Sequence, residues 1–175
     1  MKKITFCLSI VVLSLMLTFV CKGQINSIEL NKKKLLIVKF ENSINVKEPN
    51  FKGGRAGDSD ERPLELISSL YWKFEESLVD IYVEDFFSES DSIKYFKINY
   101  GENSLSPMRI YGVKITNLGD EAWLIPIKSN YEHSRTQLVL RKGTVKLFIR
   151  ATSNALAIRF AEYLVETIKH HNETM

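Results

Sequence analysis

Cysteine is almost absent from this sequence of 175 residues, and both of its cysteines, Cys7 and Cys21, lie near the start. The chain after Cys21 therefore forms no disulfide and offers neither a thiol nucleophile nor a thiolate ligand for a metal. A domain without disulfides depends on its hydrophobic core for stability. About 150 residues are enough for this, because a domain of that size buries roughly two-thirds of the surface of its unfolded chain.

An excess of charge is also lacking once the first residues are set aside. The full chain has 24 Lys and Arg against 21 Asp and Glu, but residues 1–23 contain three of the bases and none of the acids. The remaining residues therefore have no formal net charge at pH 7. Because a neutral domain has no general attraction for phosphate groups, we expect no nucleic-acid partner.

The first 23 residues show the pattern of a cleavable secretory signal. Lys2 and Lys3 precede a nearly unbroken apolar run, Ile4–Val20. Cys21 and Gly23 then occupy the positions three and one before a cut, where signal peptidase requires small residues. The sequence therefore predicts cleavage after Gly23 and export to the periplasm or the extracellular space.

Two other fates of this segment remain open. Cys21 could carry a lipid anchor, although Val20, Phe19 and Thr18 fit poorly, since lipid attachment requires a small residue directly before the cysteine. The apolar run could also stay uncleaved as an anchor, although its about 17 residues are slightly few for a transmembrane helix. We expect the protein to contact a membrane only in these two cases.

The hydropathy pattern of residues 24–175 predicts a single domain. Residues 35–40 form a short aliphatic run typical of a buried strand. Residues 42–63 contain two prolines and three glycines, which predicts a long flexible loop. Pro63 suits the first turn of a helix, and residues 64–71 carry apolar side chains at helical spacing.

The rest of the chain is rich in strand signals. Ser88 is a candidate helix N-cap, Gly101 suits a helix end, and Lys142-Gly143-Thr144 is the clearest hairpin turn. Ser153 or Asn154 caps the last helix. The predicted strands are 79–84, 109–116, 122–127 and the two arms of a hairpin at 137–150, and the predicted helices are 89–98 and 154–170.

This order of elements predicts an α+β fold, with an antiparallel-dominated sheet, helices packed on one face and a long C-terminal helix. Leu118–Ala122, the later Lys142-Gly143 hairpin and the closing Ala-rich helix resemble a recurrent class of uncharacterised secreted bacterial domains, over residues 79–170. The resemblance supports the fold and implies no activity.

Aromatic residues supply the most credible binding site. Phe86 and Phe87 follow an alternating strand and cannot both face one side, so one of them should be exposed or covered by residues 42–63. An exposed aromatic patch beside a loop is typical of a partner-binding surface. We therefore take Arg55, Phe86, Phe87 and Trp123 as candidates for contact with an envelope protein, a peptide or a glycan.

Metal-binding and catalytic patterns are weak. Asp58, Asp60 and Glu61 offer oxygen ligands but lack the regular spacing of a calcium loop. His133 lies between a glutamate and a serine, but adjacent loop residues point apart, and the sequence has no nucleophile elbow. His170-His171 are neighbours about 100° apart on a helix and cannot form one metal-binding face. We expect no metal and no cofactor.

Two functions remain as hypotheses. The first is a non-catalytic binding or structural domain of the cell envelope. The second is a small secreted hydrolase or transferase that uses acidic residues, for which Asp58, Asp60, Asp120 and Glu121 are the candidates. An enzyme of this kind needs two carboxyl groups with separated pKa values in one cleft.

We predict that the protein, produced from its full sequence in an exporting bacterium, begins at Gln24. Gly23→Leu should block processing, because a large residue does not fit the pocket one position before the cut. Cys21→Ala keeps a small residue and should still be cleaved. Intact-mass spectrometry measures the product, and a chain that begins with a lipid-modified Cys21 would contradict cleavage after Gly23.

Overall fold

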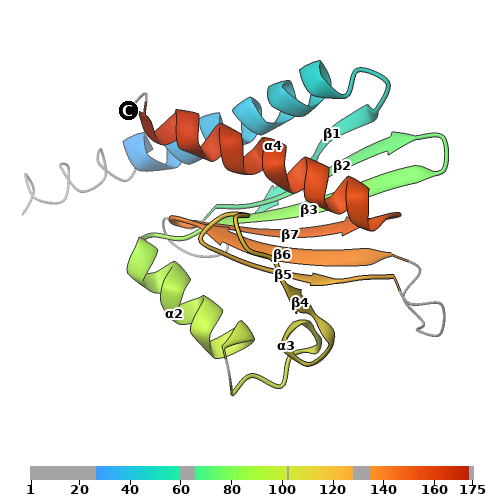
Figure 1. The fold of residues 1–175 in the computed structure, drawn as a ribbon. Helices are drawn as coiled ribbons and strands as arrows, with labels where there is room; N and C mark the ends of the chain where they lie inside the picture. The colour runs from blue at the N-terminus through green and yellow to red at the C-terminus, as the bar shows by residue number, and fades with distance from the viewer. Residues whose placement is uncertain (1–26, 60–65, 102, 128–134, 174–175) are drawn as a thin grey trace, which may run out of the picture.

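A seven-stranded sheet forms the centre of the structure, a computed structural model that describes residues 27–59, 66–101, 103–127 and 135–173 (Figure 1). The strand order is β1-β2-β3-β7-β6-β5-β4, and every neighbouring pair is antiparallel. The strands are β1 Lys52–Ser59, β2 Leu66–Phe74, β3 Ser77–Asp85, β4 Val113–Lys114, β5 Glu121–Ile125, β6 Thr136–Lys142 and β7 Val145–Ala151.

Helices lie on both faces of this sheet (Figure 1). Residues 27–47 form a first helix, which runs antiparallel to α4 (Asn154–Glu173), and these two long helices cover the inner face. The helices α2 (Glu89–Tyr100) and α3 (Pro107–Tyr111) lie against the opposite, outer face. Among the described residues, no helix is long and apolar enough to span a membrane.

The main core lies between the inner face and the two long helices. Every second side chain of β2, β3, β6 and β7 is buried there, which is the period of a strand. Trp72 packs against Phe160 of α4 with ring centroids 6.1 Å apart, and its Nε1 donates to Oδ1 of Asn45 at 3.1 Å. Each large apolar side chain buried in this way contributes roughly 1.5–3 kcal/mol to stability.

A second, smaller core lies under α2 and α3 on the outer face. Phe96 of α2, Met108 of α3 and Val139 of β6 are buried there, together with partly buried side chains of β5 and β7. This cluster covers only the half of the outer face formed by β5, β6 and β7. The half formed by β1, β2 and β3 retains exposed aromatic side chains.

The predicted fold class is confirmed by the antiparallel sheet and the long C-terminal helix. The local signals also hold: Ser88 Oγ accepts from the Asp91 N–H at 3.2 Å at the start of α2, and Ser153 Oγ accepts from the Leu156 N–H at 3.2 Å in α4. Gly143 forms the hairpin turn with φ +58°. The prediction of helices on one face is incomplete, since α2 and α3 occupy the other face.

The predicted strand at 35–40 is wrong, because these residues lie inside the 27–47 helix. Over the wider window, Lys33, Leu36, Ile37, Phe40 and Ile44 are buried, which is helical spacing. The six-residue apolar run was too short to distinguish the two periods.

The predicted flexible loop at 42–63 is also wrong over most of its length. Residues 42–47 continue the first helix and Lys52–Ser59 is the edge strand β1, while residues 60–63 lie outside the described part of the chain. Glycines weaken a strand in isolation, but pairing along β2 compensates for this at the edge.

Two further elements differ from the prediction. Residues 66–71 belong to β2 and not to a helix: Leu66, Leu70 and Trp72 are buried at even spacing. Most of the predicted strand at 109–116 is replaced by α3 and the two-residue β4. Ser106 caps α3 and Pro107 occupies its first turn, a start signal that outweighs the alternation that follows.

We predict that Gly119→Ala destabilises the domain and that Gly57→Ala does not. Gly119 has φ +68°, and an added Cβ would lie 2.6 Å from the carbonyl oxygen of Arg141, so the substitution should cost at least about 1–3 kcal/mol. A Cβ on Gly57 would meet no atom within 4 Å. Urea unfolding of both variants measures the difference, and equal midpoints would contradict this account of Gly119.

Candidate functional site

The four residues predicted to bind a partner do not form one surface. Arg55 lies on β1 and Trp123 on β5, with β2, β3, β7 and β6 between them in the sheet. Phe86 is buried against Tyr95 of α2, with ring centroids 5.2 Å apart, whereas Phe87 is 58% exposed. The two phenylalanines do differ in exposure, as their positions after a strand predict.

The individual surroundings of Arg55 and Trp123 favour a structural role. The guanidinium of Arg55 forms ion pairs with Glu41 at 3.6 Å and with Asp58 at 3.1 Å. Trp123 packs into the second core, and Arg109 lies over its ring at 5.2 Å.

Among the acidic residues proposed for an enzyme, Asp58 lies apart from Asp120 and Glu121. Asp58 accepts a hydrogen bond from Ser68 on the β1 side of the sheet, whereas Asp120 and Glu121 both contact the buried Arg141 at 3.3 Å. Partial burial works to raise the pKa of Asp120, but hydrogen bonds from the Lys142 side chain and the Gly143 N–H lower it overall. Asp120 is therefore held as a carboxylate and is a poor proton donor.

The remaining sequence candidates give no metal centre. Asp60, Glu61 and His133 lie outside the described residues. Within the described ranges, no group of three His, Cys, Asp or Glu side chains is placed to hold a metal ion. His170 is exposed beside Glu173, whereas His171 is buried.

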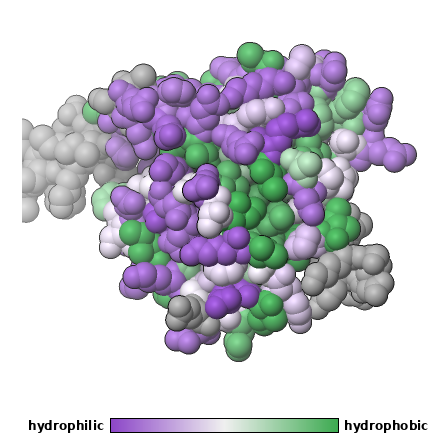
Figure 2. Space-filling model, in the orientation of Figure 1, coloured by the Kyte–Doolittle hydropathy of each residue, from purple (hydrophilic) through white to green (hydrophobic). Residues whose placement is uncertain are grey.

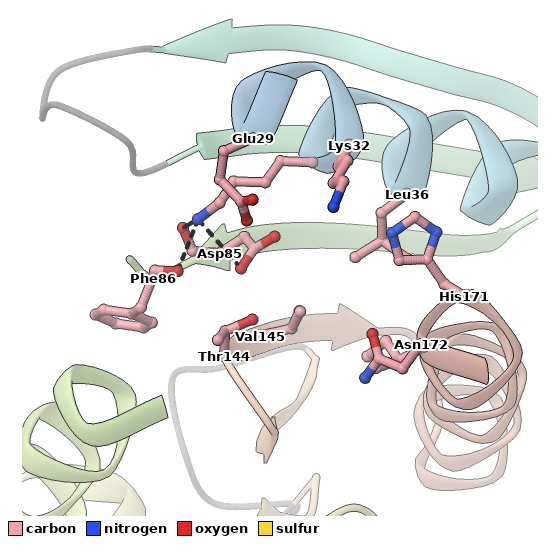
Figure 3. A pocket seen from close by; sticks show the side chains of 11 residues that line it. Glu29, Lys32, Leu36, Asp85, Phe86, Thr144, Val145, His171 and Asn172 are labelled. Carbon is pink, nitrogen blue, oxygen red and sulfur yellow. Dashed lines mark hydrogen bonds and ion pairs between the residues drawn. The ribbon is translucent and has the colours of Figure 1, made fainter. Parts of the chain in front are cut away.

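His171 belongs to a polar cavity of about 70 Å³ at one end of the sheet, which we call the end pocket (Figure 3). Lys33, only 4% exposed, closes it: its Nζ donates to the carbonyl oxygens of Asp85 at 3.0 Å and Phe86 at 2.7 Å. The same nitrogen lies 3.5 Å from Oδ1 of Asp85. Lys33 thus ties the first helix to the end of β3.

The end pocket is too small for an organic ligand, and its groups join the first helix to β3. Its volume corresponds to a few water molecules. Burial raises the pKa of Asp85 although the Lys33 ammonium opposes the shift, and burial with nearby lysines lowers the pKa of His171. Breaking a buried ion pair of this kind costs about 3–5 kcal/mol.

A larger cavity of about 260 Å³ lies on the outer face, and we call it the sheet pocket. It opens where the cover of α2 ends, so its walls come from β2, β3, β7 and the last residue of α2. The lining residues are Ile67, Tyr82, Val83, Glu84, Tyr100, Lys146 and Phe148.

An ion pair lies in the sheet pocket. Glu84 and Lys146 are directly opposite each other on β3 and β7, are mostly buried, and bond through Lys146 Nζ and Glu84 Oε2. Lys146 Nζ also donates to the hydroxyl of Tyr95 at 3.2 Å. Burial works to lower the pKa of Lys146, but Glu84 and Tyr95 raise it overall, so this lysine is a fixed cation. Burial also raises the pKa of Tyr100, which remains a neutral hydroxyl.

Three aromatic side chains lead from the open half of the outer face into the sheet pocket, and we call them the aromatic strip: Tyr71, Tyr82 and Phe148. Tyr71 is 47% and Tyr82 38% exposed, and the rings of Tyr82 and Phe148 lie 6.1 Å apart. Tyr71 and Tyr82 are diagonal neighbours on β2 and β3, a separation that aromatic side chains bridge.

Polar groups hold the strip in place. Arg150 Nη2 donates to the hydroxyl of Tyr82 at 2.6 Å, and its guanidinium lies 5.2 Å from the ring of Tyr82. Asp80 accepts from Arg135 at 2.6 Å and lies 3.8 Å from Arg150. The contacts of Arg150 orient the ring of Tyr82.

The sequence predicts which side chains of each strand share a face, but not which strands are neighbours at this site. Alternation placed Asp80, Tyr82 and Glu84 on one face of their strand, and Lys146 and Phe148 on one face of theirs. What local patterns lacked was the pairing of β3 with β7, which sets these two faces side by side.

Another exposed apolar region lies at the opposite edge of the sheet. Figure 2 shows hydrophilic side chains over α4 and apolar side chains gathered below it. Ile110, Tyr111, Val113 and Ile127 are the exposed large apolar residues around α3, β4 and β5. Neither the end pocket nor the sheet pocket lies at this edge, so we take the sheet pocket as the stronger candidate.

No protein-family model matches the chain, and no curated protein or solved structure matches it significantly. Its function therefore has to be inferred from the chemistry of the sheet pocket and the aromatic strip.

We predict that Asp85→Asn and Asp120→Asn change the pH dependence of stability in opposite directions. The folded state raises the pKa of Asp85 above 3.8, so this group destabilises the fold at neutral pH and ceases to do so as the pH falls toward 3.8. The folded state lowers the pKa of Asp120, so its stabilising contribution is lost on acidification.

The measurement is the free energy of urea unfolding of each variant minus that of the wild type, from neutral pH down to about pH 3, because the contribution of Asp120 is lost only as the pH falls below its unfolded-state pKa of 3.8. The difference should fall with decreasing pH for Asp85→Asn and rise for Asp120→Asn. Slopes of the same sign would contradict the environments assigned to these two carboxyl groups.

Proposed function

We propose that this protein is a non-catalytic binding domain that works outside the cytoplasm and holds its ligand in the sheet pocket and along the aromatic strip. The observation that carries the proposal is a cavity of about 260 Å³ that combines aromatic walls with a buried ion pair. Ligand sites are typically concave and largely apolar, with a few polar groups that fix orientation.

The polar groups of the sheet pocket support binding rather than catalysis. Lys146 is a cation whose pKa is raised, so it is neither a general base nor a nucleophilic amine near neutral pH. Its partner Glu84 is fixed by the same ion pair. Asp58, Asp120 and Glu121, three of the acids named for a hydrolase or transferase, do not line this cavity, and Asp60 lies outside the described residues. Neither the sheet pocket nor the end pocket brings two of these three acids together, as a hydrolase or transferase of this kind would need.

Export is the second part of the proposal. It is supported by the signal pattern of residues 1–23, by the neutral and cysteine-free remainder of the chain, and by the resemblance of residues 79–170 to secreted bacterial domains. An exported binding domain would meet proteins, peptides and glycans of the cell envelope. Attachment to a membrane follows only if Cys21 is lipidated or the signal is retained.

A fragment screen on ¹⁵N-labelled protein of residues 24–175 tests the binding part. Small aromatic and polar fragments should shift the backbone amides of β3 and β7 around Tyr82 and Phe148, because these residues line the cavity. Tyr82→Ala should remove the shifts, and Tyr111→Ala, which removes a comparably exposed tyrosine at the end of α3, should not.

The same samples test the absence of catalysis. Fragments and their esters, amides and glycosides should be recovered unchanged after prolonged incubation. Shifts that cluster elsewhere, or turnover that Glu84→Gln abolishes, would overturn the proposal.

A further inference from the structure

We infer that the aromatic strip and the sheet pocket bind an uncharged carbohydrate chain. This inference rests on the proposed binding function and names its ligand class. The argument uses the shape of the open half-face, its balance of charge, and the saturation of its backbone hydrogen bonds.

The open half-face is flat beside the strip. Gly54 and Gly57 of β1 lie opposite Tyr71 and Ser69 of β2, so the β1 residues paired with these two positions carry no side chain. A Cβ on Gly57 would meet no atom within 4 Å, so packing does not require glycine there. The result is a low surface on which a chain of rings can lie against the faces of Tyr71 and Tyr82.

The size of the sheet pocket suits one ring of such a chain. Its volume of about 260 Å³ lies below the roughly 300–1,000 Å³ of pockets that hold drug-sized molecules. A terminal sugar would enter the pocket beside Phe148, and the next sugars would lie along Tyr82 and Tyr71. The C–H face of a sugar ring is apolar and packs against an aromatic ring.

The charges around the strip are paired, which disfavours a charged ligand. Asp80 lies between Arg135 and Arg150, and Glu84 bonds to Lys146, so every charge has a partner of opposite sign, with one base in excess. An anion would meet the two carboxylates, and a cation would meet the three bases. An uncharged ligand avoids repulsion by either set of charges.

The same groups supply both hydrogen-bond donors and acceptors. A sugar hydroxyl donates one hydrogen bond and accepts others, so it needs both kinds of partner. Asp80 and Glu84 accept, whereas Arg150 and Lys146 donate. The hydroxyl of Tyr82 accepts from Arg150 and retains its own hydrogen as a donor. An apolar ligand would cover these donors and acceptors without offering any of them a hydrogen bond.

An extended peptide fits the surface less well. Peptides that bind sheets usually add a strand at an edge, where backbone groups are available. The strip lies on β2, β3 and β7, each of which is paired with a strand on both sides. A peptide lying on this face would therefore lose water from its own backbone groups without gaining a backbone partner.

The test is titration of the protein of residues 24–175 with cellohexaose, chitohexaose, mannohexaose, maltohexaose and xylohexaose, followed by calorimetry and by amide shifts. At least one should bind with Kd below about 10 mM. Tyr71→Ala and Tyr82→Ala should each weaken that binding about tenfold, since each removes a stacking surface. Tyr111→Ala, the matched control, should leave Kd unchanged.

Two further measurements separate recognition of sugar from a loss of structure or from charge attraction. Tyr82→Phe keeps the ring and should retain most of the affinity, whereas an unfolded variant would lose all of it. Because the ligand is uncharged, Kd should change less than about twofold between low and high salt. Preference for an oligogalacturonate, with strong salt dependence, would overturn the inference.

Failure of the inference and failure of the proposed function give different results. If fragments shift the amides around Tyr82 but none of the five oligosaccharides binds, the carbohydrate inference is wrong and the binding function stands. If an extended peptide binds through the tyrosines instead, the carbohydrate inference is likewise wrong and the binding function stands. If neither fragments nor oligosaccharides bind, both are wrong.

Discussion

The pairing of β3 with β7 joins the two halves of this protein, and the rest of the structure depends on it. It connects the meander β1-β2-β3 to the group β7-β6-β5-β4, so that one continuous sheet separates the two helical layers (Figure 1). The bond between Lys146 and Glu84 spans 62 residues of sequence. Bringing two residues this far apart in sequence together costs loop-closure entropy, which one ion pair does not offset. The burial of the neighbouring apolar residues on the inner face therefore has to stabilise the pairing of β3 with β7.

The two faces of this sheet are covered unequally, and the proposed site results from that difference. The inner face is buried along its length by the first helix and α4, and the hydrogen bonds of Lys33 attach the end of β3 to this layer. The outer face is covered by α2 and α3 only over β5, β6 and β7. Tyr71 and Tyr82 therefore remain at the surface on a rigid support, which suits a binding role because little conformational entropy is lost when a ligand arrives.

The parts of the fold that could be predicted from sequence are those with local causes. The cap at Ser88, the turn at Gly143 and the apolar stripe of α4 each involve residues a few positions apart. The strand predicted at 35–40 failed because Leu35 and Val38 are apolar although they are exposed, so the short run looks uniformly apolar. The helical spacing of the buried Leu36, Phe40 and Ile44 emerges only over a longer window. The glycines of β1 indicated a loop because the partner strand that stabilises them is not visible in the local pattern.

By itself, the sequence determined that the chain after Cys21 has no thiol chemistry, that residues 24–175 carry no net charge, and where the hairpin turn and the caps of α2 and α4 lie. These properties follow from composition or from neighbouring residues. Only the tertiary structure decided the strand order, the environment of Lys33, and the meeting of Tyr82 with Phe148 and of Glu84 with Lys146. Each of these depends on which distant segments pack together, and that choice is made by the burial of the whole inner face rather than by any local preference.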